Sequence, residues 1–262
     1  MITIKSRKEF EKMAVAGRAV AVVLETVKRA AGPGVTLKEL DVIAAEVIRS
    51  RGCVPSFLGY HGYPASICTS PNSVIVHGIP SDYRLVEGDV LSIDAGAIFE
   101  GFHGDAAITF PIGEVSPEAQ LLIDTTERAL IAGIARVKAG ARLGDIGDAI
   151  ESEAHVHGFG VVREYVGHGI GRQMHEDPQV PNYGKPGTGT KLRKGMAICI
   201  EPMFNLGGHE TTVEQDGWTV VTADGSLSAH FEHTIAITEA GPRIMTLLGA
   251  QEDDLAVAPA DG

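Results

Sequence analysis

Apolar residues recur at helical spacing in two stretches of the chain, residues 34–52 and 140–158. In the first, they stand at positions 37, 40, 43, 44, 47 and 48, which form one face of an α-helix. Thr36 and Glu39 have the spacing of a capping box, and Gly52 can end the helix in a left-handed conformation. The second stretch aligns with the first without gaps. The pattern predicts one amphipathic helix in each stretch.

A further helical stretch precedes each of these, over about residues 7–30 and 118–138. The second is preceded by Ser116 as N-cap, with Pro117 at the first helical position, where the fixed φ of proline suits a helix. We therefore expect a pair of helices at the beginning of each half of the chain.

Strand-like segments follow both helix pairs. Residues 86–94 align with residues 192–201, and both segments are rich in β-branched and apolar residues after a turn that contains glycine. The alignment places Asp94 over Glu201. Amphipathic helices resemble each other by chance, but the shared carboxylate favours an internal duplication.

Composition narrows the class of protein. The 262 residues are 44% hydrophobic and 21% charged, as in globular proteins, and the net charge of -12 argues against DNA binding by bulk electrostatics. The charged N-terminal stretch and the short apolar run after it do not resemble a signal or membrane segment. Cys53, Cys68 and Cys199 lack zinc-finger or CxxC spacing, which favours a reducing, cytoplasmic location and buried, unpaired thiols.

Two aspartates lie on one predicted hairpin. If its strands are joined by a two-residue loop at Glu100 and Gly101, residue 105 opposes residue 96, and Asp105 lies diagonally across from Asp94 on the same face. Carboxylates this close must share a proton or bind a cation. The hairpin therefore predicts half of a metal site.

Three further residues suit the same site. Glu201 follows the apolar run MAICI, Glu232 lies in HFEHT before a strand-like segment, and His168 lies in the glycine-rich GHGIG. Taken singly, the two aspartates could be a hairpin cap and a surface charge, the two glutamates ion-paired strand ends, and His168 a turn histidine. Together, four carboxylates and one imidazole are typical of a two-metal hydrolase site.

These site residues come from both parts of the chain, so the parts must face one cleft. We expect one catalytic domain over residues 1–250, made of two similar halves at about 1–112 and 113–250. Residues 251–262 are acidic and rich in alanine and proline, which predicts a disordered tail.

The sequence resembles a known protein family. Nearly the whole chain is similar to the type I methionine aminopeptidases in their minimal bacterial form, through the motifs NSVIVHGIP, SIDAGAIFEGFHGDAAITF, GHGIGRQMHEDPQVPNYG, AICIEPMF and AHFEHT. The resemblance implies the pita-bread fold, an α/β (α+β) architecture in which a pseudo-two-fold repeat of helices packs on a curved, largely antiparallel sheet. That fold agrees with the duplication inferred above.

The resemblance also assigns roles to the five candidate ligands. Asp94 would hold one metal ion, His168 and Glu201 the other, and Asp105 and Glu232 would bridge the two. A water between the ions would be acidified to a hydroxide that attacks the first peptide carbonyl, with Glu201 shuttling the proton. Cobalt, manganese, iron or zinc would all suit these ligands, and the sequence leaves the choice open.

Substrate contacts follow from the same resemblance. His175 would stabilise the developing oxyanion and His77 would contact the scissile amide, although singly each histidine could be a turn or loop residue. A soft wall for a thioether side chain is expected, with ordinary core packing as the alternative, from Tyr60, Tyr63, Cys68, Met174 and Trp218. The family often has an aromatic residue at position 174 and a cysteine at position 57, which leaves the pocket shape open. Asn72, Val74 and Ser228 match the positions that bind one monovalent cation in some relatives.

The implied activity is metal-dependent removal of the initiator methionine from nascent proteins and peptides when the second residue is small. An Xaa-Pro peptidase of the same fold is the nearest alternative, and a non-catalytic binding protein of this fold is a more distant one. The expected partners are nascent polypeptide N-termini, with transient ribosome contact left open and a monomer expected.

Overall fold

A computed structural model describes residues 1–249, and the tail expected at 251–262 lies outside them. Within this range the α-helices are α1 (Arg7–Ala30), α2 (Leu37–Ser50), α3 (Pro117–Ile134) and α4 (Leu143–His157). The capping box of Thr36 and Glu39 is present at the start of α2, as predicted. None of the helices within the described residues is long and apolar enough to cross a membrane.

The third helix is shorter than the sequence pattern predicts. It begins at Pro117 after the N-cap Ser116, but it ends at Ile134, so the expected extension to residue 138 is wrong. The backbone N–H groups of Arg136 and Val137 donate to carbonyl groups three residues earlier, at 3.0 and 2.9 Å. Tight turns of this kind end an α-helix.

The strands form one large and two small sheets, and all of the pairings are antiparallel. The large sheet runs β1-β4-β5-β14-β9-β7-β8, with β2 beside β4 and β15 beside β14. Its strands are β1 (Val54–Pro55), β2 (Ile67–Pro71), β4 (Val90–Phe99), β5 (Phe102–Pro111), β7 (Gly167–Gly169), β8 (Glu176–Val180), β9 (Ala197–Ile200), β14 (Glu232–Thr238) and β15 (Gly241–Ile244). One small sheet joins β6 (Gly160–Val161), β10 (Met203–Asn205) and β13 (Ser228–His230), and the other joins β3 (Val74–Val76), β11 (Thr211–Val213) and β12 (Val220–Thr222).

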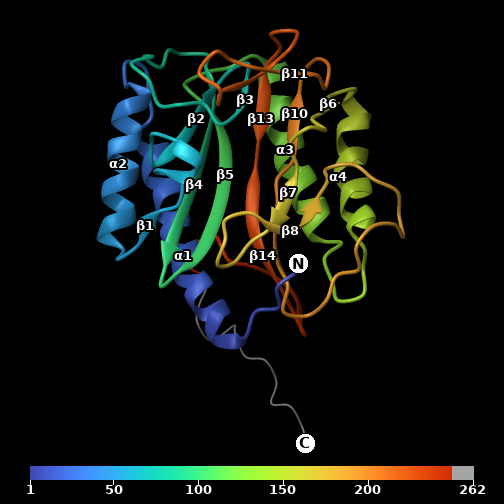
Figure 1. The fold of residues 1–262 in the computed structure, drawn as a ribbon. Helices are drawn as coiled ribbons and strands as arrows, with labels where there is room; N and C mark the ends of the chain where they lie inside the picture. Colours follow the sequence, from blue (N-terminus) through green and yellow to red (C-terminus); the bar gives the residue numbers. More distant parts are fainter. Residues whose placement is uncertain (250–262) are drawn as a thin grey trace, which may run out of the picture.

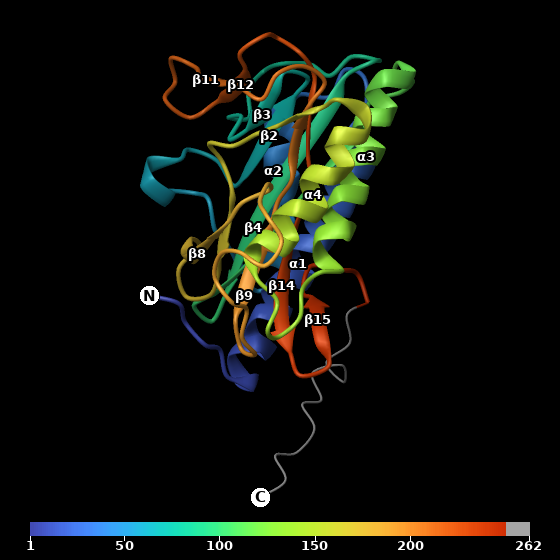
Figure 2. The same cartoon turned by 90° about the vertical axis from the view of Figure 1, so that its right-hand side faces the viewer.

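The helices lie on one side of the large sheet. Figure 1 shows α1 and α2 beside β4 and β5, and Figure 2 shows α3 and α4 on the side of the strands opposite β8 and β11. Gly104 of β5 lies against Gly17 of α1, where an added Cβ would come within 2.7 Å of the Gly17 nitrogen. One apolar core is built mainly from α1, α2, β4 and β5, and a second mainly from α3, α4, β9 and β14. The helix pairs on a curved, antiparallel sheet confirm the expected fold class.

The hairpin of β4 and β5 has the predicted register. Gly96 pairs with Asp105, and the strands are joined by Glu100 and Gly101. Both loop residues have positive φ, 46° and 78°, as a two-residue hairpin turn requires. Asp94 and Asp105 therefore reach the same face of the sheet.

Candidate metal centre and substrate cleft

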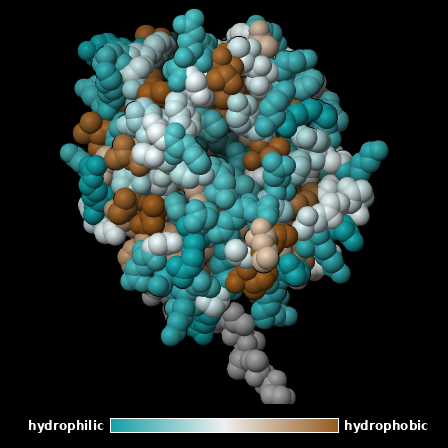
Figure 3. All heavy atoms as spheres, viewed as in Figure 1, coloured by the Kyte–Doolittle hydropathy of each residue, from teal (hydrophilic) through white to brown (hydrophobic). Residues whose placement is uncertain are grey.

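A cavity of about 130 Å³ lies on the open side of the large sheet. Figure 3 shows that the face seen in Figure 1 is hollowed near its centre. The cavity is lined by the five residues expected to bind metal, by the two expected catalytic histidines and by the five residues expected to form the pocket. These are Asp94, Asp105, His168, Glu201, Glu232, His77, His175, Tyr60, Tyr63, Cys68, Met174 and Trp218, joined by Phe57.

Strands from both halves deliver the acidic residues. Asp94 and Asp105 come from β4 and β5, and Glu232 begins β14, where it pairs with Ala107 of β5. Glu201 directly follows β9, and its carbonyl accepts a hydrogen bond of 2.9 Å from the Asn182 side chain. The large sheet thus brings carboxylates that are far apart in the sequence to one point.

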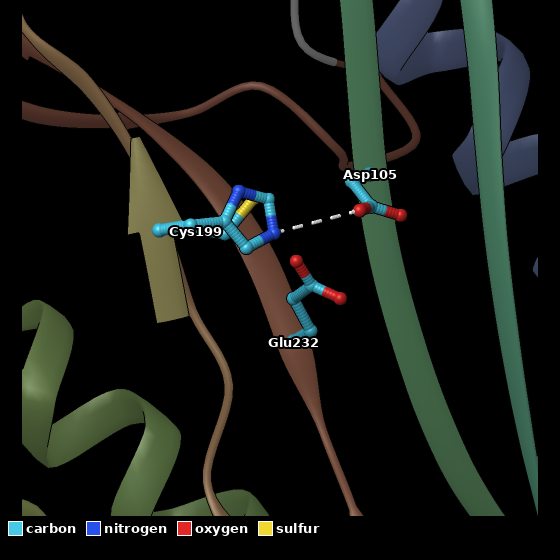
Figure 4. Close-up of side chains that lie close together, drawn as sticks. Asp105, Cys199 and Glu232 are labelled. Carbon is cyan, nitrogen blue, oxygen red and sulfur yellow. Dashed lines mark ion pairs between the residues drawn. The ribbon is translucent and has the colours of Figure 1, made fainter. Parts of the chain in front are cut away.

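His168 lies in β7, a short strand within the glycine-rich GHGIG segment. Its Nδ1 lies 2.9 Å from the carbonyl oxygen of Gly169, so Nε2 is the nitrogen directed at the acidic residues. That Nε2 lies 3.6 Å from Oε1 of Glu201 and 3.9 Å from Oδ2 of Asp105. Figure 4 shows the side chains of Asp105 and Glu232 close together.

Without a cation, the acidic residues resist ionisation. Burial raises the pKa of Asp94 to about 7, and burial together with the Asp94 carboxylate raises the pKa of Glu201 to about 8. Burial and the neighbouring carboxylates also raise the pKa values of Asp105 and Glu232. Burial lowers the pKa of His168 to about 3, so its ring is neutral and can act as a ligand.

The residues fit a divalent metal ion. Within residues 1–249, the buried oxygens Asp94 Oδ1, Asp105 Oδ1 and Glu232 Oε1 have no hydrogen-bond partner. Buried oxygens without partners are rare because each loses its hydration. Carboxylate oxygens and one neutral imidazole are ligands that suit manganese, iron, cobalt or zinc.

Sequence reasoning missed three residues near this centre. Cys199 of β9 has its Sγ within 4.8 Å of ligand atoms of Asp105, His168 and Glu232, and burial keeps its pKa well above the usual range. Figure 4 shows its side chain close to those of Asp105 and Glu232. The segment HFEHT could have revealed His230, because alternating residues of a strand share a face.

The buried His230 completes this side of the cluster. Its Nε2 lies 3.8 Å from Oε2 of Glu201 and has no hydrogen-bond partner among the described residues. His103, the third missed residue, is also buried, and its Nδ1 contacts the hydroxyl of Ser56 at 2.9 Å. The alternation of strand β5 puts it on the face of Asp105.

The two histidines expected to contact substrate flank the cluster. His175 lies in the loop before β8, with Nδ1 2.7 Å from the Tyr60 hydroxyl and its ring centre 4.2 Å from that of His168. His77 follows β3 with a φ of 61°, and its ring meets the Tyr165 ring edge-on. Burial lowers the pKa of His77 to about 4 and also lowers that of His175, so both rings are neutral near pH 7.

An apolar cluster closes the other end of the cavity. It comprises Phe57, Tyr63, Ala65, Cys68 and Met174, with Tyr60, Ile79 and Trp218 packed against it. Trp218 comes from the loop between β11 and β12, where Asp216 accepts a hydrogen bond of 2.8 Å from its backbone N–H. Phe57 was not among the expected pocket residues, although it directly precedes the segment LGYHGYP.

The three residues expected to hold a monovalent cation lie on neighbouring segments. The Asn72 carbonyl accepts a hydrogen bond of 2.9 Å from the backbone N–H of Ser228, and Val74 begins β3. The Asn72 side chain is bound to Asp89 and to the backbone of Val90. A cation at these residues stays a prediction.

The fold and the cluster together define a protein with a buried, carboxylate-rich candidate metal centre on an antiparallel sheet that is covered by helices. The sequence model of metallopeptidase family M24 matches residues 11–239, and the chain belongs to this family. It is 51% identical over 248 residues to a methionine aminopeptidase of Clostridium acetobutylicum, covering 94% of this chain and 99% of that protein.

A solved structure of a methionine aminopeptidase is also similar to this chain. The structure of methionine aminopeptidase from Thermotoga maritima matches with a TM-score of 0.93 and 46% identity, covering 95% of this chain and 100% of that one. A prolidase from Pyrococcus furiosus matches with a TM-score of 0.76 and 21% identity, covering 94% of this chain and 65% of that one. The second match shows a shared fold alone.

Proposed function

We propose that this chain is a metal-dependent aminopeptidase that removes the N-terminal methionine from peptides and nascent proteins. One observation carries the proposal. The same cavity of about 130 Å³ is bounded by the acidic cluster at one end and by an apolar wall that contains Met174 and Trp218 at the other. A methionine side chain can pack on this wall while the first peptide bond lies over the cluster.

In this proposal two divalent ions occupy the cluster. Asp94 would hold one ion, His168 and Glu201 would hold the other, and Asp105 and Glu232 would contact both. When bound, the ions would lower the pKa of a water molecule and polarise the peptide carbonyl. The chain's own contribution is to hold four carboxylates at one point and to exclude bulk water from it.

Glu201 is the proposed proton carrier. Its carboxylate lies at the end of β9, beside His168 and His230, and its pKa of about 8 in the metal-free protein shows how strongly burial and Asp94 act on it. A carboxylate bordering the cavity can accept a proton from water and deliver it to the leaving amine. Nε2 of His230 lies 3.8 Å from the other oxygen of this carboxylate.

The neutral rings of His175 and His77 act on the peptide. A neutral imidazole can donate one N–H to the carbonyl oxygen as negative charge develops there, and such a preorganised donor is worth more inside a cleft than in water. The hydroxyl of Tyr60, 2.7 Å from Nδ1, fixes the orientation of the His175 ring. His77 borders the same cavity and is placed to contact the scissile amide.

A His175→Ala variant should separate catalysis from metal binding. We expect kcat to fall about a hundredfold, because removing one oxyanion donor typically costs this much. Metal binding, measured by calorimetry on the metal-stripped protein, should stay unchanged. Loss of metal binding in this variant would place His175 among the ligands and contradict the proposed role.

Several finer features belong to the same proposal. A preference for a small second residue is part of the proposal because the resemblance to the methionine aminopeptidases implies it. Further parts of the proposal are a monomer located in the cytoplasm, one monovalent cation at Asn72, Val74 and Ser228, and transient contact with the ribosome.

The alternative activity is that of an Xaa-Pro peptidase, which the shared fold with prolidases suggests. The two activities separate in one assay, in which the metal-stripped protein is titrated with manganese or cobalt. Release of the first residue is followed from Met-Ala-Ser and from an Ala-Pro peptide. We expect metal-dependent release of methionine alone. Release only from the proline peptide would favour the Xaa-Pro peptidase. If neither peptide is cleaved and no metal binds, a non-catalytic protein would be favoured.

A further inference from the structure

The segment before α1 reaches the loop that carries Met174 and His175. The backbone N–H of Lys5 donates to the carbonyl of Gly195, 2.7 Å away, in the turn before β9. Its side-chain Nζ lies 2.8 Å from Oε2 of Glu176, at the start of β8. Lys5 therefore joins the turn before β9 to the start of β8.

Both charges of this ion pair are buried. The side chains of Lys5 and Glu176 are only 4% and 7% exposed, whereas the surface pair of Lys38 and Asp82 is 57% and 84% exposed. A buried ion pair adds little net stability, because the loss of hydration offsets the attraction, but removing one partner leaves a costly unpaired charge. Such a pair is better suited to fixing a geometry than to stabilising the fold.

The pair is tightly connected to the loop backbone. Glu176 also accepts hydrogen bonds from the Thr3 hydroxyl and, at 3.2 Å, from the Gln173 backbone N–H. Burial alone would raise the pKa of Glu176, but these bonds and the Lys5 ammonium bring its pKa below the usual value. A Cβ on Gly171 would lie 2.5 Å from Cε of Lys5, so the loop rests directly on the pair.

The anchored loop carries two residues of the cleft. Met174 and His175 lie between Gln173 and Glu176, the two residues joined by the hydrogen bond described above. The Met174 side chain is buried in the apolar wall, and the His175 ring lies over His168. A shift of Glu176 would therefore move both the pocket wall and the proposed oxyanion donor.

We propose that the buried Lys5–Glu176 ion pair positions His175 and Met174 for the reaction. The inference rests on the proposed function, in which His175 contacts the peptide carbonyl. Lys5 and Glu176 are positioning residues that act through this loop. A displacement of about 1 Å in a catalytic group can cost up to a hundredfold in rate, so losing the anchor should be measurable.

The test is a Lys5→Met variant, which keeps the length of the side chain and removes its charge. We expect kcat for Met-Ala-Ser to fall on the order of tenfold, while calorimetric binding of manganese is unchanged. Lys38→Met is the matched control, because it makes the same substitution in an exposed ion pair, and it should leave kcat unchanged.

A second measurement separates positioning from a general structural effect. In a His175→Ala background, Lys5→Met should change kcat by less than about twofold, because the oxyanion donor through which it affects kcat is gone. Any effect that acts through the Met174 wall should appear in KM instead. The same loss of kcat in both backgrounds, or an unchanged kcat in the single variant, would overturn the inference. If Lys5→Met does not fold, Glu176→Gln gives the same test, because its amide oxygen can still accept from the Gln173 backbone N–H while its NH2 group cannot accept from the Lys5 ammonium.

Failure of the proposed function has a different signature. The unsubstituted protein would then release no methionine with any metal. Failure of the inference appears only in the variants, against a parent protein that is active.

Discussion

An Asp105→Asn variant is expected to lose turnover and metal loading while its metal-free form folds at least as stably as the parent protein. Asparagine has the same shape but no negative charge. Burial and the neighbouring carboxylates raise the pKa of Asp105, which means that its charge opposes folding when no cation is present. Removing the charge relieves that repulsion and also removes a proposed bridging ligand.

The expected losses of metal affinity and of turnover are large. Loss of groups that merely support metal ligands already costs 10–100-fold in metal affinity, so loss of a ligand should exceed about a hundredfold. Turnover should fall by roughly three orders of magnitude, equivalent to about 4 kcal/mol of transition-state stabilisation. Calorimetry with manganese, the melting temperature with and without metal, and methionine release measure the three effects.

Asp89→Asn is the matched control for this variant. Asp89 is also buried, but its carboxylate accepts hydrogen bonds from the Tyr83 hydroxyl, the Asn72 amide and the backbone N–H of Val86. An amide group cannot accept all of these bonds, so stability should fall by about 1–3 kcal/mol while metal still raises the melting temperature. The proposed site would be wrong if Asp105→Asn kept full turnover or if both variants behaved alike.

The contrast between these two aspartates shows what a sequence can predict. The pairing of Asp94 and Asp105 on one face followed from strand alternation and a two-residue turn, because both are local rules. Glu201 could be predicted because it repeats the position of Asp94 in the second half. Strand geometry thus predicted the pair of aspartates, whereas the family resemblance supplied the fold and the roles of the other site residues.

Other features depend on contacts between distant segments. The pairing of Lys5 with Glu176 joins residues 171 positions apart, and no local pattern marks Lys5 as buried. Phe57 borders the cavity because β1, which lies just before it in the chain, pairs with β4. No local sequence pattern predicts this pairing. Helix α3 ends early because tight turns form at Arg136 and Val137, although the sequence pattern there is also compatible with a helix.

The metal-free protein should lose stability as the pH rises from 7 to 8.5. The pKa of Asp94 rises from 3.8 to about 7 on folding, and that of Glu201 rises from 4.5 to about 8. A group whose pKa is raised on folding stabilises the folded state while it is protonated, and this contribution is lost as the pH rises through the folded-state pKa. The raised pKa values of Asp105 and Glu232 act in the same direction.

The buried histidines do not change the stability between pH 7 and 8.5. Burial lowers the pKa values of His77 and His103 to about 4 and those of His168 and His230 to about 3. A lowered histidine pKa costs stability only as the pH falls below the unfolded value of 6.5, so these groups act on the acid side. Melting temperature should therefore pass through a maximum near neutral pH and fall on both sides.

The loss of stability between pH 7 and 8.5 should depend on the acidic cluster. Over this window Asp94 and Glu201 should account for about 2 kcal/mol, or roughly 5 °C in melting temperature for a chain of this size, and Asp105 and Glu232 add to this loss. Manganese should remove the fall and stabilise the protein more at pH 8.5 than at pH 7, because only ionised carboxylates bind the metal. Asp105→Asn should flatten the alkaline side without metal. A metal-free parent protein whose melting temperature is equal at pH 7 and 8.5 would mean that the cluster is not held as a set of mutually repelling, buried carboxylates.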